Sequence, residues 1–407
     1  MYIFKAGVVG AGTMGGEIAQ VITYSGLPVV MKDIDQAMLD AGMDRVRGIY
    51  QRRVDKGKMS AGDMQSKLDL VATTLTYDGF EDVDIVIEAV PEVMGIKKRV
   101  FQELEEVCPD ATIFASNTSA LSISEMAAAT SKPHKVVGMH FFNPAHVMKL
   151  VEIIPGLDTS QETVDDVMMF TESLRKLPVV VQECPGFLVN RLLMPYLNEA
   201  TMCLEEGAAL ASEIDEAMVK WGWPMGPFTL MDMLGLDVCV HVGDYLAEEY
   251  GERMESALLM PRLAEMGRLG EKSGAGFYGY GDQTDEPTLK LMEEIKGEKG
   301  VADSEFSPER LVYPLINEAA LCLQEHVASV NDIDMAMIAG AGMTHSGERM
   351  GPLAVADLIG LDVILEGLVA FEAKYGLRFH PSRLLKLKVR AGHLGKKAGK
   401  GFHEYTE

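Results

Sequence analysis

The pattern of apolar and polar positions changes near residue 185. Before it, short apolar runs alternate with segments whose apolar residues recur at helical spacing. Seven apolar runs predict strands, and most are apolar on both faces, as is typical of buried parallel strands. They are Ile3–Val9, Pro28–Met31, Val83–Ala89, Thr112–Ala115, Val136–Met139, Leu150–Ile154 and Val179–Val181. With helices expected between them, for example at Ile96–Val107 and Glu162–Leu174, the pattern indicates a doubly wound α/β domain over residues 1–184.

After Cys184-Pro185-Gly186 the strand signals nearly vanish, and the chain repeats itself. Tyr196–Ala200 recurs as Leu315–Ala319, an offset of 119 residues (196 to 315). Lys272–Phe277 recurs as Lys397–Phe402, an offset of 125 (272 to 397), so the second copy carries six extra residues near Ala341–Met350. We therefore expect helical domains at residues 185–282 and 307–407, joined by a polar linker at 283–306.

Composition narrows the functional class. The 407 residues are 47% apolar and 24% charged, an ordinary globular balance. A formal net charge of −24 argues against a nucleic-acid binder, which needs a positive surface. No apolar run approaches the roughly 18 residues of a membrane span, and the first residues carry no cleavable signal pattern.

The five cysteines are scattered and show no CxxC spacing. This pattern argues against a disulfide scaffold and against a cysteine-based zinc site, and it fits a reducing compartment. We therefore expect a cytoplasmic protein without a metal site.

A glycine motif follows the first predicted strand. Gly10, Gly12 and Gly15 form a GxGxxG element that opens a helix. Gly10 permits the tight turn, Gly12 lets a pyrophosphate approach the backbone, and Gly15 lets the helix pack closely on the sheet. The free N–H groups of the helix N-terminus then face the phosphates.

An acidic residue at the end of the second strand specifies the cofactor. Asp33 lies 18 residues after Gly15 (15 to 33) and is followed by Ile34 and Asp35 rather than by arginine. A carboxylate there binds both hydroxyls of an adenosine ribose and repels a 2′-phosphate. The motif therefore predicts NAD rather than NADP as the cofactor.

A histidine and a glutamate follow in neighbouring strands. His140 stands where the run Val136–Met139 ends, and Glu152 lies inside the apolar run Leu150–Ile154. A carboxylate among apolar neighbours must be paired, since desolvating it alone is costly. A glutamate bound to one ring nitrogen would make the other a general base. Spacing alone also allows a structural ion pair around a core histidine.

Other polar groups have two interpretations each. Ser116–Ser119 follow a strand and either bind a substrate oxygen or cap a helix. Asn190-Arg191 either face a cleft between the two halves or start a helix. A basic cluster either steers an anion such as coenzyme A or forms a solvated helix face. Its members are Arg45, Arg47, Arg52, Arg53, Lys56 and Lys58.

Taken together, these segments resemble the L-3-hydroxyacyl-CoA dehydrogenase family over nearly the whole chain. The likeness is closest to the dehydrogenase part of the bacterial multifunctional fatty-acid oxidation α-subunit, which also carries tandem helical domains. The matching segments are Gly10–Gly15, Met31–Ile34, Phe114–Ser119, Gly138–Pro144, Leu150–Ile154, Pro185–Arg191 and Trp223–Phe228. The resemblance implies a Rossmann-type domain followed by two all-α domains like the C-terminal domain of 6-phosphogluconate dehydrogenase.

The resemblance also implies roles for individual residues. His140 acts as the general base supported by Glu152, and Ser119 and Asn190 bind substrate near the reacting carbon. The nicotinamide side of the pocket is formed by Glu92, Lys97, Asn143 and Lys272. Lys56 and Lys58 are candidates for contact with coenzyme A. The activity implied is reversible NAD-dependent oxidation of (S)-3-hydroxyacyl-CoA.

Two departures from the family pattern are visible. Val93 follows Glu92 where the family usually has asparagine, and no hydratase-isomerase segment precedes Met1, so we expect a single reaction step. In the second repeat, Glu309-Arg310 replace Asn190-Arg191, so we expect that copy to have lost catalysis and to pack on the first as an internal pseudo-dimer. The alternatives are a dehydrogenase of a non-CoA hydroxy acid and a non-catalytic scaffold.

Overall fold

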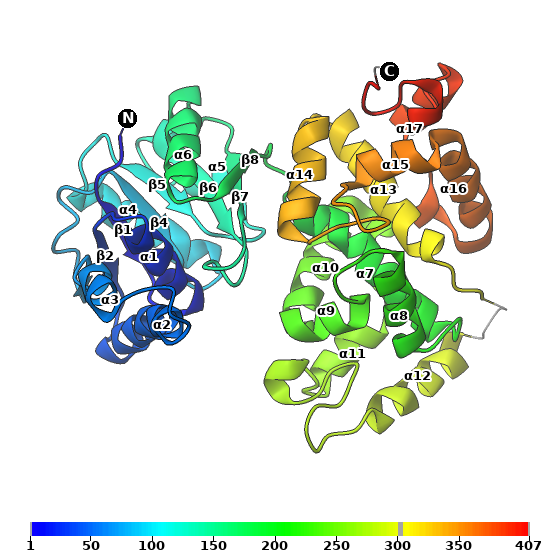
Figure 1. The fold of residues 1–407 in the computed structure, drawn as a ribbon, viewed down its shortest axis with the longest axis horizontal. Helices are drawn as coiled ribbons and strands as arrows, with labels where there is room; N and C mark the ends of the chain where they lie inside the picture. The colour runs from blue at the N-terminus through cyan, green and yellow to red at the C-terminus, as the bar shows by residue number, and fades with distance from the viewer. Residues whose placement is uncertain (1, 300–303, 406–407) are drawn as a thin grey trace. The chain divides into compact units, whose positions relative to one another are not determined.

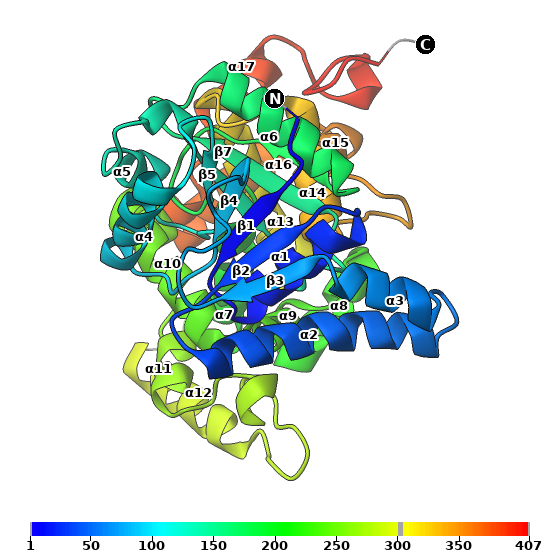
Figure 2. The ribbon, with the colours of Figure 1, turned by 90° about the vertical axis from the view of Figure 1, so that its left-hand side faces the viewer.

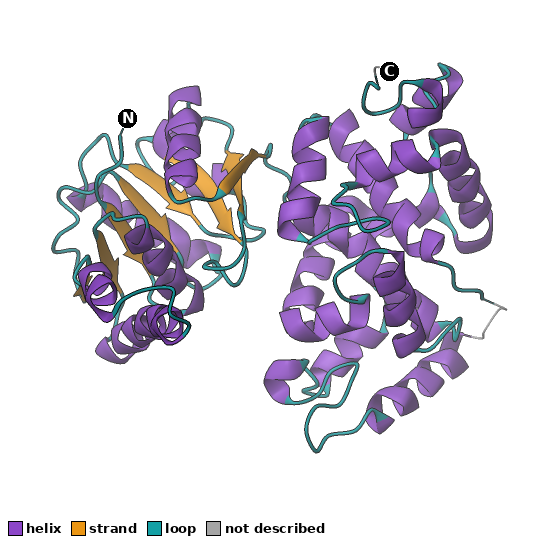
Figure 3. Ribbon diagram, in the orientation of Figure 1, coloured by secondary structure: helices purple, strands orange, loops and turns teal. Residues whose placement is uncertain are grey.

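The computed structural model describes residues 2–299 and 304–405. The chain divides into two compact units, Met1–Phe187 and Leu188–Glu407. Within the described residues, the named strands all belong to unit 1, and unit 2 is built from helices and loops (Figure 3). No helix of the described ranges is both long and apolar enough to cross a membrane.

Unit 1 contains an eight-stranded sheet in the order β3-β2-β1-β4-β5-β6-β7-β8. The strand order reverses beside β1, which pairs with both β2 and β4, so the carboxyl ends of these strands border a crevice of the type that binds ligands in open α/β sheets. The strands are β1 (Ala6–Val9), β2 (Val29–Lys32), β3 (Val71–Thr74), β4 (Ile85–Glu88), β5 (Ile113–Ser116), β6 (Val136–Phe141), β7 (Leu150–Pro155) and β8 (Leu177–Val180).

Helices complete this unit (Figures 1 and 2). They are α1 (Thr13–Tyr24), α2 (Gln36–Asp55), α3 (Ala61–Leu68), α4 (Met94–Val107), α5 (Ile123–Ala127), the 3-10 turn η1 (Pro133–Lys135) and α6 (Gln161–Ser173). Side chains cap several of them: Asp35 accepts the Met38 amide at the start of α2, and Ser160 accepts the Thr163 amide at the start of α6. The strands β1, β2, β4 and β5 are buried along their whole length, which agrees with their apolar sequences.

Two features of the sheet differ from the sequence prediction. β3 was not predicted, because it is an edge strand with two exposed residues and lacks the continuous apolar run of the inner strands. β7 runs antiparallel to β6, whereas the apolar pattern indicated a parallel sheet. A strand buried on both faces reads the same in either direction, so periodicity cannot reveal its orientation.

In unit 2 the helices of the first repeat recur in order in the second. The first set is α7 (Val189–Glu205), α8 (Ala211–Trp221), α9 (Pro227–Leu234), α10 (Leu236–Tyr250), η2 (Gly251–Met254), α11 (Leu259–Glu265) and η3 (Glu271–Ser273). After α12 (Glu286–Lys299), the second set is α13 (Pro308–Gln324), α14 (Val330–Gly340), α15 (Pro352–Ile359), α16 (Leu361–Tyr375), η4 (Leu377–Phe379), α17 (Arg383–Arg390) and η5 (Lys396–Ala398).

The first helices of the two repeats, α7 and α13, pack together and exchange ion pairs. On α7, Arg191 donates to Glu318 of α13 at 2.7 Å and also pairs with Glu325 at 2.7 Å. On α13, Arg310 pairs with Glu199 at 2.7 Å and with Glu206 at 2.8 Å. Both guanidinium groups are buried. The residues of the two networks are equivalent at the offset of 119. Each repeat therefore supplies the arginine of one network and the two glutamates of the other.

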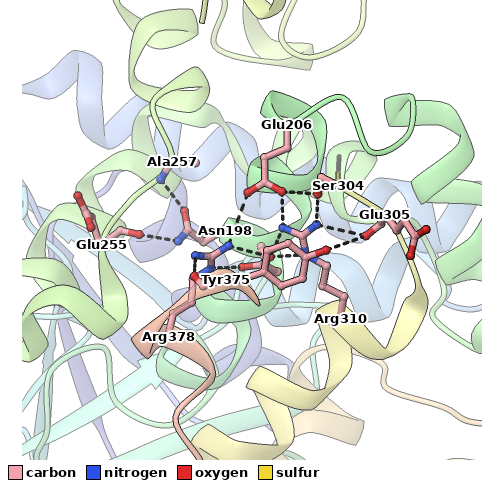
Figure 4. Close-up of polar contacts among 10 residues, drawn as sticks. Asn198, Glu206, Glu255, Ala257, Ser304, Glu305, Arg310, Tyr375 and Arg378 are labelled. Atoms are coloured by element: carbon pink, nitrogen blue, oxygen red, sulfur yellow. Dashed lines mark hydrogen bonds and ion pairs between the residues drawn. The ribbon is translucent and has the colours of Figure 1, made fainter. Parts of the chain in front are cut away.

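Further arginines extend both networks. Arg253 reaches Glu318 at 2.8 Å, and its counterpart Arg378 reaches Glu199 at 2.6 Å. Figure 4 shows the second network, in which Ser304 and the Glu305 carbonyl, just before α13, accept hydrogen bonds from Arg310. The linker therefore helps to satisfy the charges that join the repeats.

A buried aspartate fastens the end of each repeat. Asp232 accepts the backbone N–H groups of Phe277 and Tyr278, and Asp357 accepts those of Phe402 and His403. In each repeat a second aspartate also forms a hydrogen bond with a side chain of this end segment, and the side chain differs between the repeats.

In the first repeat the Tyr278 hydroxyl donates to Asp215 at 3.0 Å. In the second, His403 Nε2 bonds Asp334 at 2.7 Å. This bond raises the pKa of His403, with further help from the charges of Asp334 and Asp357, while burial and Lys388 oppose the rise.

We predict that the end of the second repeat loosens as pH rises. The pKa of His403 is higher in the folded state than the usual value of about 6.5 in an unfolded chain. The stabilisation by this histidine is therefore complete below the unfolded-state pKa and is lost as the pH rises through the folded-state pKa. Amide-exchange protection of Phe402 and His403, corrected for intrinsic rates, should fall above about pH 7 in the wild type. His403→Tyr, which copies Tyr278, should remove this dependence; equal pH profiles for both proteins would contradict the prediction.

Candidate active site

The glycine motif forms the turn between β1 and α1. Gly10 has φ +101°, and a Cβ there would lie 2.6 Å from the Ala89 carbonyl oxygen. A Cβ on Gly15 would lie 1.7 Å from the Gly10 carbonyl oxygen, so only glycine fits. At Gly12 a Cβ would meet nothing within 4 Å. This open space beside the backbone, next to the start of a helix, fits a pyrophosphate and would be filled by any side chain.

Asp33 directly follows β2 and braces the same turn. Its Oδ2 accepts the Ala11 amide at 2.6 Å, and Oδ1 accepts the Ile34 amide at 2.6 Å. Each carboxylate oxygen has a further lone pair for a ribose hydroxyl. The Ile34 side chain is 84% exposed, so the position beside Asp33 has room for a larger group.

A buried ion cluster lies at the ends of β4 and β5. Lys97 is 1% exposed and donates to both oxygens of Glu88, at 2.8 and 3.1 Å, and pairs with Glu92 at 3.1 Å. Glu88 also accepts from the Ser116 hydroxyl at 2.6 Å and the Val90 amide at 2.7 Å. Glu88 is not among the predicted site residues, although a lone carboxylate that ends the apolar run Ile85–Glu88 is a visible signal.

Glu92 connects this cluster to the loop after β5. It accepts the Ser119 amide at 2.9 Å and the Thr118 hydroxyl at 2.5 Å. Burial opposes ionisation of Glu92, but the Lys97 charge and these hydrogen bonds outweigh it, so the pKa of the carboxyl is lower than usual. The loop that carries Ser119 is thus held by an ionised group at neutral pH.

His140 and Glu152 face each other across the antiparallel pair β6 and β7. His140 Nδ1 lies 2.7 Å from Glu152 Oε2, and the two side chains are 6% and 0% exposed. Phe142 and Phe187 pack near the imidazole, with ring centroids at 4.4 and 5.8 Å. Because Glu152 engages Nδ1, the neutral ring carries its proton there, and Nε2 is the nitrogen that can accept another.

The remaining predicted residues lie at several places. Asn143 is exposed in the loop after β6. In unit 2, Asn190 is the second residue of α7. Lys272 of η3 pairs with Asp237, and its counterpart Lys397 pairs with Asp362 at 2.6 Å. Both repeats keep this ion pair, so Lys272 has a structural partner in addition to its predicted role at the cofactor.

Part of the predicted basic cluster lines a cavity of about 490 Å³ in unit 1. Lys56 and Lys58 lie there with Arg52 and Arg53, whereas Arg45 and Arg47 do not line it. Four further lining residues were not predicted from the sequence: His146, Lys149, Arg175 and Lys176. No carboxylate of the described residues lines this cavity, which therefore suits a phosphorylated ligand.

A larger cavity of about 860 Å³ lies in unit 2, and none of the predicted site residues lines it. It is bordered by helices of both repeats, including residues Tyr250, Arg253, Asn317 and Arg383. Size alone therefore does not identify the reaction site in this chain.

Two family models cover the chain. The NAD binding domain of 3-hydroxyacyl-CoA dehydrogenase matches residues 5–184, and the C-terminal domain of the same family matches residues 186–280 and again 306–405. The second match falls on the two repeats.

Relatives with similar sequences or structures carry names that agree with the family of these models. The fatty acid oxidation complex subunit alpha of Psychrobacter arcticus is 41% identical over 372 residues, which is 88% of this chain and 51% of that protein. The chain thus spans about half the length of such relatives. The crystal structure of 3-hydroxybutyryl-CoA dehydrogenase from Escherichia coli K12 superposes with TM-score 0.86 at 31% identity, over 96% of this chain and 99% of that one.

A second structure matches a shorter part of the chain. The (S)-3-hydroxybutyryl-CoA dehydrogenase of Ralstonia eutropha is 41% identical with TM-score 0.67, covering 69% of this chain and all of that one (100%). By its glycine turn, its histidine–glutamate pair and its match to both domain models, the chain belongs to the 3-hydroxyacyl-CoA dehydrogenase family.

Proposed function

We propose that this protein catalyses the reversible, NAD-dependent oxidation of (S)-3-hydroxyacyl-CoA to 3-oxoacyl-CoA. The observation that carries the proposal is the buried pair His140 and Glu152, with Nδ1 and Oε2 2.7 Å apart at the carboxyl end of β6. A buried carboxylate on one ring nitrogen raises the basicity of the other, as general-base catalysis needs. The (S) configuration rests on the family alone.

In the oxidation, Nε2 of His140 removes the proton of the C3 hydroxyl, and Glu152 stabilises the imidazolium that forms. Bound NAD would supply the hydride acceptor, held by the open turn at Gly12 and by Asp33. In the reverse direction, protonated His140 returns its proton to the C3 oxygen. The two rings beside His140 limit water around the imidazole and so strengthen its pairing with Glu152.

Other residues position the reactants in this proposal. Ser119 and Asn190 hold the C3 oxygen and the thioester, and Glu92, Lys97, Asn143 and Lys272 border the nicotinamide. The ion pairs that Lys97 makes with Glu88 and Glu92 fix that border in one arrangement.

Coenzyme A is favoured over a smaller hydroxy acid by the cationic cavity in unit 1. Lys56 and Lys58 would meet its phosphates there, and a substrate without phosphates would leave these charges unused. Both fatty-acid β-oxidation and short-chain hydroxybutyryl-CoA metabolism are compatible with this chemistry. The odd number and scattered placement of the five cysteines favour a reducing cytoplasm as its location.

We assign four segments to this function. Residues 1–184 bind NAD, 185–282 complete the substrate site, 283–306 form the linker, and 307–407 form a structural copy. The reciprocal pairs of Arg191 with Glu318 and of Arg310 with Glu199 support an internal pseudo-dimer of the two helical repeats.

Replacing His140 by alanine should lower kcat about 10²- to 10⁴-fold, the usual value of general acid–base catalysis. Glu152→Gln should lower it in the same direction, because the imidazolium loses its counter-charge. Steady-state oxidation of 3-hydroxybutyryl-CoA measures both, and NAD binding by fluorescence titration should be unchanged as a control. Retention of more than a tenth of wild-type turnover by His140→Ala would exclude this residue as the base.

Asp33 should determine the choice of cofactor. Like charges about 4 Å apart near a protein surface repel by ~4 kcal/mol, which corresponds to a preference for NAD on the order of 1,000-fold. Asp33→Ser combined with Ile34→Arg should shift kcat/KM toward NADP, because it removes the repulsion and adds a phosphate partner. Equal kcat/KM for the two cofactors in the wild type would remove Asp33 from this role.

The matched positions Asn190 and Glu309 should behave differently. Each is the second residue of the first helix of its repeat. Asn190→Asp replaces a hydrogen-bond donor by an anion and should lower kcat on the order of 100-fold. Glu309→Asn, the matched control, should leave kcat within about twofold. A comparable loss in both variants would show that the second repeat takes part in catalysis.

A further inference from the structure

The loop of residues 142–149 joins the two strands that carry the catalytic pair. It leaves β6 just after His140 and Phe141, carries Asn143, and enters β7, on which Glu152 lies. A displacement of this loop would therefore move the His140 imidazole and the Asn143 side chain, which is predicted to border the nicotinamide.

One lysine from outside the loop holds it in place. Lys176 lies between α6 and β8, and its ammonium donates to the carbonyl oxygens of Ala145 and Met148, the latter at 2.6 Å. The loop also lies next to α1, where His146 Nδ1 is 3.2 Å from Glu17 Oε2 without the geometry of a hydrogen bond. The loop is thus attached to the α6–β8 turn and lies close to the helix that follows the glycine motif.

The same lysine also lines the cationic cavity. Other cationic or imidazole side chains that line it include Arg175, Lys56 and Lys58, and His146 and Lys149 from the loop itself. Burial lowers the pKa of Lys176 to about 8, the charge of Lys149 acts in the same direction, and Glu17 opposes them. A phosphate in the cavity would favour the charged ammonium, which is the form that donates to the two carbonyls.

We propose that Lys176 is a positioning residue through which the phosphorylated end of the substrate orders loop 142–149, so that binding energy from the nucleotide raises turnover at His140. The inference rests on the proposed function. Interactions remote from the reacting atoms raise kcat only when they order the site for the transition state; otherwise they change KM alone. Lys176 has the required geometry, because its ammonium contacts the loop and the residue also lines the cavity.

The test compares two thioesters that differ only in the remote end. 3-Hydroxybutyryl-CoA carries the phosphorylated nucleotide, and 3-hydroxybutyryl-pantetheine lacks it. For the wild type we expect kcat with the pantetheine thioester to be at least tenfold lower at saturation. Equal kcat for the two substrates in the wild type would overturn the inference without any variant.

Three variants then test whether Lys176 links phosphate binding to turnover. Lys176→Met should lower kcat for the CoA thioester to the level of the pantetheine thioester and leave kcat for the latter within twofold. Lys176→Arg, which keeps a permanent charge and two donors, should retain kcat for the CoA thioester within about threefold. Lys67→Met makes the same change in α3 as a control and should leave kcat unchanged for both thioesters.

The other outcomes are distinct. Equal loss of kcat for both thioesters in Lys176→Met would mean a purely structural lysine, and a rise in KM alone would mean a simple phosphate ligand; either overturns the inference. Unfolding of Lys176→Met, monitored by circular dichroism, leaves the wild-type comparison and Lys176→Arg as the deciding measurements. If the wild type oxidises neither thioester, the proposed function fails instead.

Discussion

The cost of burying a carboxylate determines where the cations of this molecule lie. The chain has 61 acidic and 37 basic residues, and several of its glutamates lie under the surface. An unpaired buried anion would cost several kcal/mol, and four of the buried glutamates have a basic partner: Glu152 with His140, Glu88 with Lys97, and Glu199 and Glu318 with buried arginines. The first pair supports the proposed chemistry, the second holds the loops around it, and the last two join the repeats.

Much of the fold and of the candidate site could be predicted because the signals were local. The alternation of apolar runs and helical segments gave an α/β unit followed by a helical one, and the structure confirms both. The glycine turn depends on residues within one turn of chain, and Glu152 is found opposite His140, as a glutamate inside an apolar strand suggested. The roles of these residues in catalysis stay predictions.

The rest depended on contacts between distant segments, which spacing along the chain does not encode. Lys149, Arg175 and Lys176 complete the basic cavity from the segments just before β7 and β8, which begin about a hundred residues after Lys56 (56 to 149). The direction of β7 was invisible for a similar reason, since its burial pattern is the same in either orientation. The extra residues of the second repeat also contact the first: the His345 ring packs at a tilt against Trp221 with centroids 4.5 Å apart, and Thr344 donates to the Gly222 carbonyl.

Because the reciprocal ion pairs between α7 and α13 lie within one chain, the contact between the two repeats does not depend on protein concentration. When two identical chains meet through such an interface, the fraction associated falls as the protein is diluted. Here both partners are parts of one polypeptide, so each arginine meets its glutamates at an effective concentration fixed by the linker, whatever the number of molecules in the cell. The two halves are also inherited as one gene product in strict one-to-one ratio, which leaves either copy free to diverge without creating mismatched pairs between unlike subunits.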